Sequence, residues 1–171
     1  MKRFILVVLL IFFIFSFVHS AAYDQVAPYT EVTFKIYGVK VTAPKKFATK
    51  IYIALEKLNY LNMIKILRLA KVNRIEIDYY PVGICKRAIA YVNDSHIDDS
   101  RKNTIYFVFN MDDSYFMKNY IEDVSYDNIA VTIMHECYHL THDEEHDLEE
   151  ENAQECERKA RILITQEIPL P

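Results

Sequence analysis

Hydrophobic and polar residues alternate along the chain just after residue 30. The hydrophobic positions of this pattern are Val32, Phe34, Ile36, Val39 and Val41. Alternation with a period of two is typical of strands that bury one face, and Tyr37-Gly38 lies between the two runs as a turn would. The segment from Glu31 to Val41 therefore predicts a β-hairpin.

The hydrophobic period lengthens after the hairpin. Ile51, Leu55 and Leu58 recur at helical spacing in a segment over residues 46–58. One apolar stripe with charged residues on the other faces predicts an amphipathic helix, and we expect a second helical piece to continue through Leu69. Such a helix buries its stripe against a sheet.

Three further segments are expected to form strands. Arg74–Tyr79 alternates strictly, whereas Ala88–Val92 and Thr104–Phe109 are strand-like in composition. A polar stretch joins the last two, which predicts that they pair antiparallel. The sheet is therefore expected to be mixed or antiparallel.

The chain is expected to end in two helices. Ile129, Ile133 and Met134 are at helical spacing just before residues 135–139, so we expect these five residues to lie in the middle of a helix. Asp147 can cap a last helix. The apolar stripe of that helix consists of Ala153, Cys156, Ala160, Leu163 and Ile164.

Length and composition limit the classes of protein to consider. The chain has 171 residues, of which 51% are hydrophobic, which suits one small α+β domain over residues 21–171. Its two glycines exclude a glycine-rich phosphate-binding loop. The net charge is −4, so the sequence predicts no broad basic face and no nucleic-acid partner.

The first twenty residues differ in composition from the rest. Met1-Lys2-Arg3 precedes an apolar run from Phe4 to Val18, and small residues follow it. These features predict a signal peptide over residues 1–20 and a secreted or periplasmic protein that begins near Ala21. An uncleaved anchor is the alternative, although the run is short for a membrane span, and only then do we expect membrane contact.

The run His135-Glu136-Cys137-Tyr138-His139 carries the candidate chemistry. Histidines four residues apart lie on one face of a helix, where both imidazoles can bind one metal ion. Glu136 lies at the edge of that face and can take a proton from a metal-bound water. The motif therefore predicts a zinc site with a general base, and surface histidines on an exposed helix are the alternative.

A catalytic zinc site needs three protein ligands and one open position, so a further ligand is required. Glu149, Glu150 and Glu151 lie in the first turn of the last helix. Helical phase places Glu149 near the centre of the apolar stripe, Glu150 on its flank and Glu151 on the far side. Helical phase therefore disfavours Glu151 as the third zinc ligand and does not decide between Glu149 and Glu150.

His135-Glu136-x-x-His139 followed by Glu150-x-x-Ala153-Gln154 resembles the gluzincin branch of the HExxH zinc metallopeptidases, or zincins, over residues 104–163. The resemblance implies a small zincin-like domain in which His135, His139 and Glu150 bind Zn²⁺ and Glu136 is catalytic. Gln154 stands where many members of that branch have an aspartate, which would support the first histidine.

We therefore expect a secreted zinc metallopeptidase that acts on a protein or peptide substrate. Glu136 would deprotonate the metal-bound water that attacks a peptide carbonyl. A non-catalytic zinc-binding module is the alternative, and a membrane-tethered interaction protein without a metal is a third interpretation. Glu136 favours the enzyme, because a purely structural zinc site does not need a base.

Three cysteines, Cys85, Cys137 and Cys156, allow one disulfide in an exported chain, with the pairing left open. Cys137 is two residues from each histidine of the motif, which is about 200° around a helix. We therefore expect Cys137 to pack against Cys156 or the sheet and not to bind the metal.

Overall fold

The computed structural model describes residues 30–79, 89–92, 103–109, 124–142 and 146–166. The chain divides into two compact units, Met1–Thr30 and Glu31–Pro171, and every element below belongs to the second. The signal-peptide prediction therefore lies outside the described residues, as does Cys85. Within the described part of the chain, no helix is long and apolar enough to cross a membrane.

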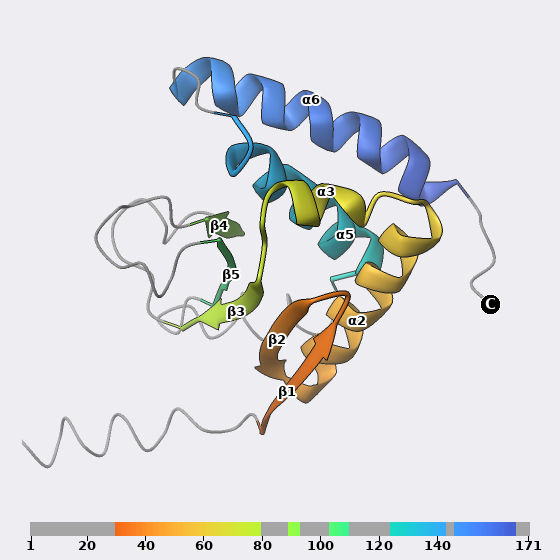
Figure 1. Cartoon of the computed structure of the whole chain (residues 1–171), viewed down its shortest axis with the longest axis vertical. Coiled ribbons are helices and arrows are strands. Elements are labelled where there is room, and N and C mark those ends of the chain that lie inside the picture. The colour runs from red at the N-terminus through yellow and green to blue at the C-terminus, as the bar shows by residue number, and fades with distance from the viewer. Residues whose placement is uncertain (1–29, 80–88, 93–102, 110–123, 143–145, 167–171) are drawn as a thin grey trace, which may run out of the picture. The chain divides into compact units, whose positions relative to one another are not determined.

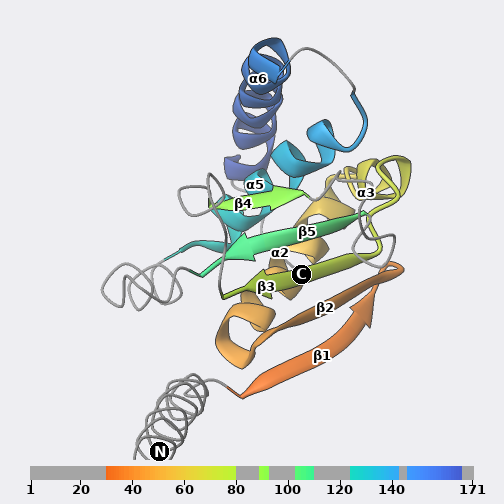
Figure 2. The same cartoon turned by 90° about the vertical axis from the view of Figure 1, so that its left-hand side faces the viewer.

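The strands form one mixed sheet in the order β1-β2-β3-β5-β4 (Figure 2). β1 and β2 pair antiparallel, as do β4 and β5, whereas β3 is parallel to both of its neighbours. The strands are β1 Glu31–Ile36, β2 Val39–Pro44, β3 Arg74–Asp78, β4 Ala90–Val92 and β5 Thr104–Val108. The sheet is mixed, which is one of the two expected arrangements, and the predicted antiparallel pairing of its last two strands is confirmed.

The predicted hairpin is also confirmed. Tyr37 and Gly38 both have positive φ angles, 51° and 91°, and they join Ile36 to its partner Val39. Two residues with positive φ make the tight turn whose twist matches that of paired strands, and glycine adopts this conformation without a Cβ clash. β2 continues three residues beyond the predicted end, to Pro44.

Helices cover one face of this sheet (Figures 1 and 2). The helices of the described part of the chain are α2 Lys45–Tyr60, α3 Lys65–Leu69, α5 Tyr126–His139 and α6 His146–Thr165. α2 and α5 pack on the sheet and on each other, and α6 lies along α5. The amphipathic helix after the hairpin, its second short piece and the α+β class are confirmed.

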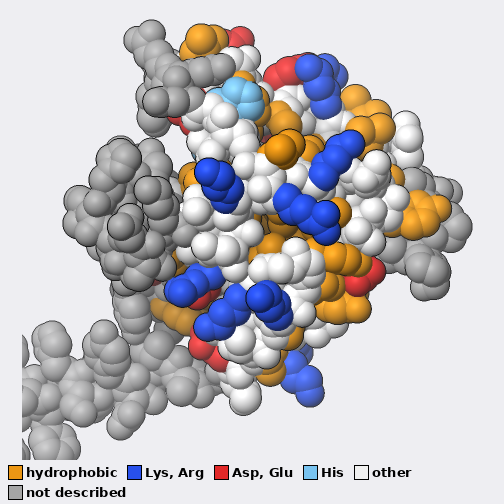
Figure 3. Space-filling view, viewed as in Figure 1, with side chains coloured by type: hydrophobic (Ala, Val, Ile, Leu, Met, Phe, Trp, Pro, Cys, Tyr) orange, Lys and Arg blue, Asp and Glu red, His pale blue; other side chains and the backbone are white. Residues whose placement is uncertain are grey.

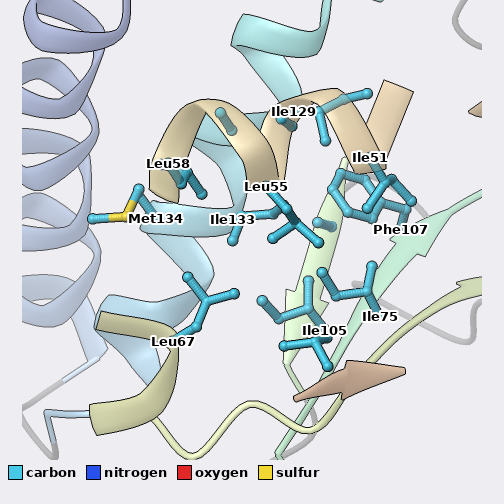
Figure 4. Packing of buried hydrophobic residues seen from close by; sticks show 14 of the residues in the cluster. Ile51, Leu55, Leu58, Leu67, Ile75, Ile105, Phe107, Ile129, Ile133 and Met134 are labelled. Carbon is cyan, nitrogen blue, oxygen red and sulfur yellow. The ribbon is translucent and has the colours of Figure 1, made fainter. Parts of the chain in front are cut away.

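The core lies between α2, α5 and the sheet (Figure 4). Its fully buried members include Ile51, Leu55, Ile75, Ile105, Phe107, Ile129 and Ile133. Met134 points from α5 toward α6 (Figure 4), so α5 is packed on more than one side. Because a well-packed helix has few alternative positions, the side chains that α5 carries are held in place.

The start of α5 is determined by local chemistry and by an ion pair to α2. The side chain of Ser125 caps the helix by accepting from the Asn128 backbone N–H, at 3.1 Å, which satisfies one of the free amides of the first turn. Asp127 lies in that turn, where the helix dipole favours an acid. The ammonium of Lys57 donates to it at 2.7 Å.

Replacing Asp127 with alanine is expected to destabilise the fold by about 2 kcal/mol, because it leaves a buried ammonium without its acceptor. The Lys57 side chain is only 8% exposed. Urea unfolding of the variant and the wild type measures this difference. Lys159→Ala is the matched control, because Lys159 pairs with Glu155 at the surface and should cost less than about 1 kcal/mol. Equal losses in the two variants would contradict this role.

Candidate metal centre

The His135–His139 motif occupies the last turn of α5, which ends at His139. The prediction that the motif lies in the middle of a helix is therefore wrong. The hydroxyl of Thr141 donates to the backbone carbonyls of Cys137 and Tyr138, both at 3.0 Å, and the backbone N–H groups of Thr141 and His142 also donate to Tyr138. The last carbonyls of the helix therefore have partners without a further turn. No hydrophobic residue lies between Leu140 and Leu148 to extend the buried face.

α6 then returns along α5 and brings its acidic first turns to the motif. It begins at His146, so Asp147 lies inside the first turn and not at the cap position that the sequence predicted. Ala153, Ala160 and Ile164 are buried as expected. Leu163 is exposed instead, because it lies about 80° around the helix from the centre of that stripe.

Three side chains converge where the two helices meet, and they are His135, His139 and Glu150. The Nε2 atoms of the two histidines are 3.1 Å apart. The carboxylate oxygens of Glu150 lie 3.5 Å from Nε2 of His139 and 3.8 Å from Nε2 of His135. Histidine atoms also reach the surface near the C-terminal end of α5 (Figure 3).

These separations fit one bound metal ion. Zinc binds nitrogen and oxygen at about 2.0–2.2 Å in a tetrahedron, so its ligand atoms lie about 3.3–3.5 Å from one another. The distances of 3.1, 3.5 and 3.8 Å between the donors lie on both sides of that spacing. Two imidazoles and one carboxylate suit Zn²⁺ but are not specific to it.

The protonation of the histidines leaves nitrogen lone pairs that can bind a cation. Nδ1 of His139 lies 2.9 Å from Oε1 of Glu149, and a carboxylate can only accept, so this nitrogen carries the proton. The Nε2 atom of His139 then has a lone pair, and it lies 3.1 Å from Nε2 of His135. Burial lowers the pKa of His135, which favours its neutral ring, and a neutral ring also has one nitrogen lone pair that can bind a metal ion.

Glu136 is buried beside this cluster, with 5% of its surface exposed. Burial, followed by the negative charge of Glu150, raises its pKa from 4.5 to about 8. A carboxyl group that keeps its proton near neutral pH is poised to exchange it. A cation bound by the neighbouring histidines would favour the ionised form.

Glu136 is expected to lower the stability of the metal-free protein as the pH rises from about 5 to about 8, against the opposite contribution of His135, whose lowered pKa adds stability as the pH rises toward 6.5. Folded Glu136 keeps its proton up to about pH 8, whereas the unfolded chain releases it near the ordinary pKa of 4.5. At Glu136 the folded state therefore binds more protons in this window, and the contribution of this group to the free energy of unfolding falls with rising pH, by an amount on the order of a few kcal/mol. Urea unfolding with a chelator present measures the pH dependence. Glu136→Gln should remove this contribution, and an unchanged slope would contradict the assignment.

The structure separates the three glutamates in the first two turns of α6. Glu150 joins the two histidines, Glu149 contacts Nδ1 of His139, and Glu151 is exposed. Gln154 donates to Oε1 of Glu150 at 3.0 Å and does not support His135. The sequence reasoning missed Glu157, whose Oε2 lies 3.5 Å from Nδ1 of His135. Its position seven residues after Glu150, on the same face of the helix, was the available signal.

Neither described cysteine takes part in the cluster. Cys137 is fully buried in the core, Cys156 is half-buried, and both are free thiols. Burial raises the pKa of Cys137, so its thiol stays protonated and is a poor metal ligand. Cys137 belongs to the hydrophobic core, and that it does not bind the metal stays a prediction.

The chain was compared with models of protein families, with curated proteins and with solved structures. None of the three comparisons finds a match.

Proposed function

We propose that this chain is a zinc metallopeptidase with a zincin-like domain, exported by the segment over residues 1–20. The observation that carries the proposal is the convergence of His135, His139 and Glu150 beside the buried acid Glu136. Zinc bound there would supply a Lewis acid and an activated water. The three side chains would hold it, and Glu136 would accept the proton of that water.

The number of donors favours an enzyme over a structural zinc site. A structural zinc ion is coordinated by four protein ligands, whereas a catalytic zinc ion has three protein ligands and keeps one coordination position open. Among the residues that the structure describes, only three donors converge. Glu136 adds a proton acceptor that a structural site does not require. The two histidines on one helix and a glutamate on the next also agree with the resemblance to the gluzincins.

The exposure of the site suits a large substrate. The side chain of Glu150 is 43% exposed, and a hollow of about 460 Å³ opens beside His135, lined also by Gln154, Glu157 and Arg158 among others. An unfolded chain or a peptide can approach an open cleft of this kind, whereas a small ligand would be poorly enclosed. We therefore propose a protein or peptide substrate.

Cleavage of an unfolded protein tests this function. The purified chain is loaded with zinc and incubated with a reduced and alkylated protein, and new N-termini are identified by mass spectrometry. We expect cleavage that stops when a chelator removes the zinc and returns when zinc is restored. A zinc-loaded chain that produces no new termini would overturn the peptidase and leave a zinc-binding module.

A further inference from the structure

Four residues on the first three turns of α6 face the candidate metal centre. They are Glu149, Glu150, Gln154 and Glu157. Only one of them, Glu150, belongs to the ligand set. Each of the other three lies next to a different ligand, so each can orient one donor.

His135 lacks a hydrogen-bond partner that its position requires. Its Nδ1 is buried and makes no hydrogen bond within the described part of the chain. Buried ring nitrogens are rarely left in this way. Oε2 of Glu157 lies 3.5 Å away, about 0.5 Å beyond a good hydrogen bond, so a small movement of either side chain closes it.

Glu157 is held in a suitable orientation by Arg161. The guanidinium donates to Oε1 of Glu157 at 2.8 Å and to Oδ1 of Asn128 on α5, also at 2.8 Å. Arg161 therefore links the two helices and engages one carboxylate oxygen. The other oxygen of Glu157 is the one that faces His135.

The remaining two ligands have partners at hydrogen-bond distance. Nδ1 of His139 donates to Oε1 of Glu149 at 2.9 Å, and the Glu149 side chain is only 19% exposed. Nε2 of Gln154 donates to Oε1 of Glu150 at 3.0 Å. Gln154 is thus engaged with the carboxylate ligand, and its amide is not available to orient His135.

We infer that Glu157 and Glu149 are the positioning residues of His135 and His139, with Gln154 positioning Glu150. A carboxylate that accepts from Nδ1–H fixes the tautomer of a histidine and directs the Nε2 lone pair to the metal. Glu157, about one helical turn after Gln154, then supports His135. This is the role that the resemblance implies for an aspartate in place of Gln154. This inference rests on the metal site of the proposed function, but not on the peptidase reaction.

Zinc affinity tests the inference in the full chain. Glu157→Ala and Glu149→Ala should each weaken zinc binding by about 10–100-fold, measured by competition with a chromogenic chelator. Glu151→Ala is the matched control, because it removes the same charge from an exposed position on the same helix and should leave the affinity within about twofold of wild type. Alanine favours helices, so the variants should keep their fold.

A second measurement uses the wild type and does not depend on the variants folding. Long-range ¹H–¹⁵N spectra of the zinc-loaded chain report which nitrogen of each histidine carries the proton. We expect Nδ1–H in both His135 and His139. Nε2–H in His135, or wild-type affinity in both Glu157→Ala and Glu149→Ala, would overturn the inference.

Failure of this inference is distinguishable from failure of the proposed function. If the wild type binds zinc and the two alanine variants bind it equally well, the positioning roles are wrong and the peptidase is unaffected. If the positioning roles hold but unfolded protein is not cleaved, the peptidase alone is wrong. If the wild type binds no zinc, the site itself fails before any variant is compared.

Discussion

Replacing either His135 or His139 with alanine is expected to abolish zinc binding. The wild type should hold about one zinc per chain, since one set of three donors converges among the described residues. Losing one of three ligands removes several kcal/mol of binding free energy, or roughly 10³-fold in affinity. Metal analysis after dialysis against a weak chelator measures the loss.

His142→Ala is the matched control for these two variants. His142 lies just beyond α5 and stacks on Tyr138 with ring centroids 3.8 Å apart, and its Nδ1 lies 2.9 Å from the hydroxyl of Thr141. It is exposed and does not belong to the cluster of donors. The control should keep its zinc. Stoichiometric zinc in His135→Ala or His139→Ala would contradict the site.

Replacing Glu136 with glutamine is expected to lower turnover by roughly 10²–10⁴-fold while zinc stays bound. The substitution is nearly isosteric, so the buried position remains filled, but an amide cannot accept the proton of the metal-bound water. Zinc content and the rate of cleavage of an unfolded protein are measured on the same preparation. The thermal midpoint of the variant shows whether the fold is retained.

Three outcomes of this substitution have different meanings. Lost turnover with retained zinc supports a general base. Lost zinc would mean that Glu136 holds the site together and does not act on water. Full activity in Glu136→Gln would end the peptidase hypothesis, because no other buried acid lies in the described core.

The order of the elements followed from local patterns along the chain. Alternation predicted β1 and β2, and the helical period predicted α2, because each pattern reflects the face that the element buries. The position of the motif within α5 was wrong because the last turn depends on Thr141 and on the polar stretch after it. Thr141 and the polar stretch are both present in the sequence, but hydrophobic periodicity alone does not predict where a helix ends.

Helical phase left Glu149 and Glu150 open as candidate ligands, and only the family resemblance chose Glu150. Phase favours the residue that points to the centre of the helix contact, and Glu149 does lie there, against Nδ1 of His139. The more exposed Glu150 lies against the Nε2 atoms of both histidines. The residue nearest the centre of the apolar stripe therefore contacts a candidate ligand, and the residue on its flank lies in the cluster of donors.

The partners of His135 could not be predicted from local sequence. Glu157 approaches the ring only because α6 runs along α5, and Arg161 orients it through Asn128, 33 residues earlier in the chain. Contacts of this kind depend on how two helices cross. Acidic residues are also common on exposed helix faces, so the pattern of Glu149 to Glu157 favoured a solvated face as well as a site.

Anomalous diffraction at the zinc edge, from crystals of the purified chain, tests the central claim most directly. We expect one peak that lies about 2.0–2.2 Å from Nε2 of His135, Nε2 of His139 and a carboxylate oxygen of Glu150. A zinc peak bound by other residues, or no peak between these three side chains in crystals grown with zinc, would contradict it.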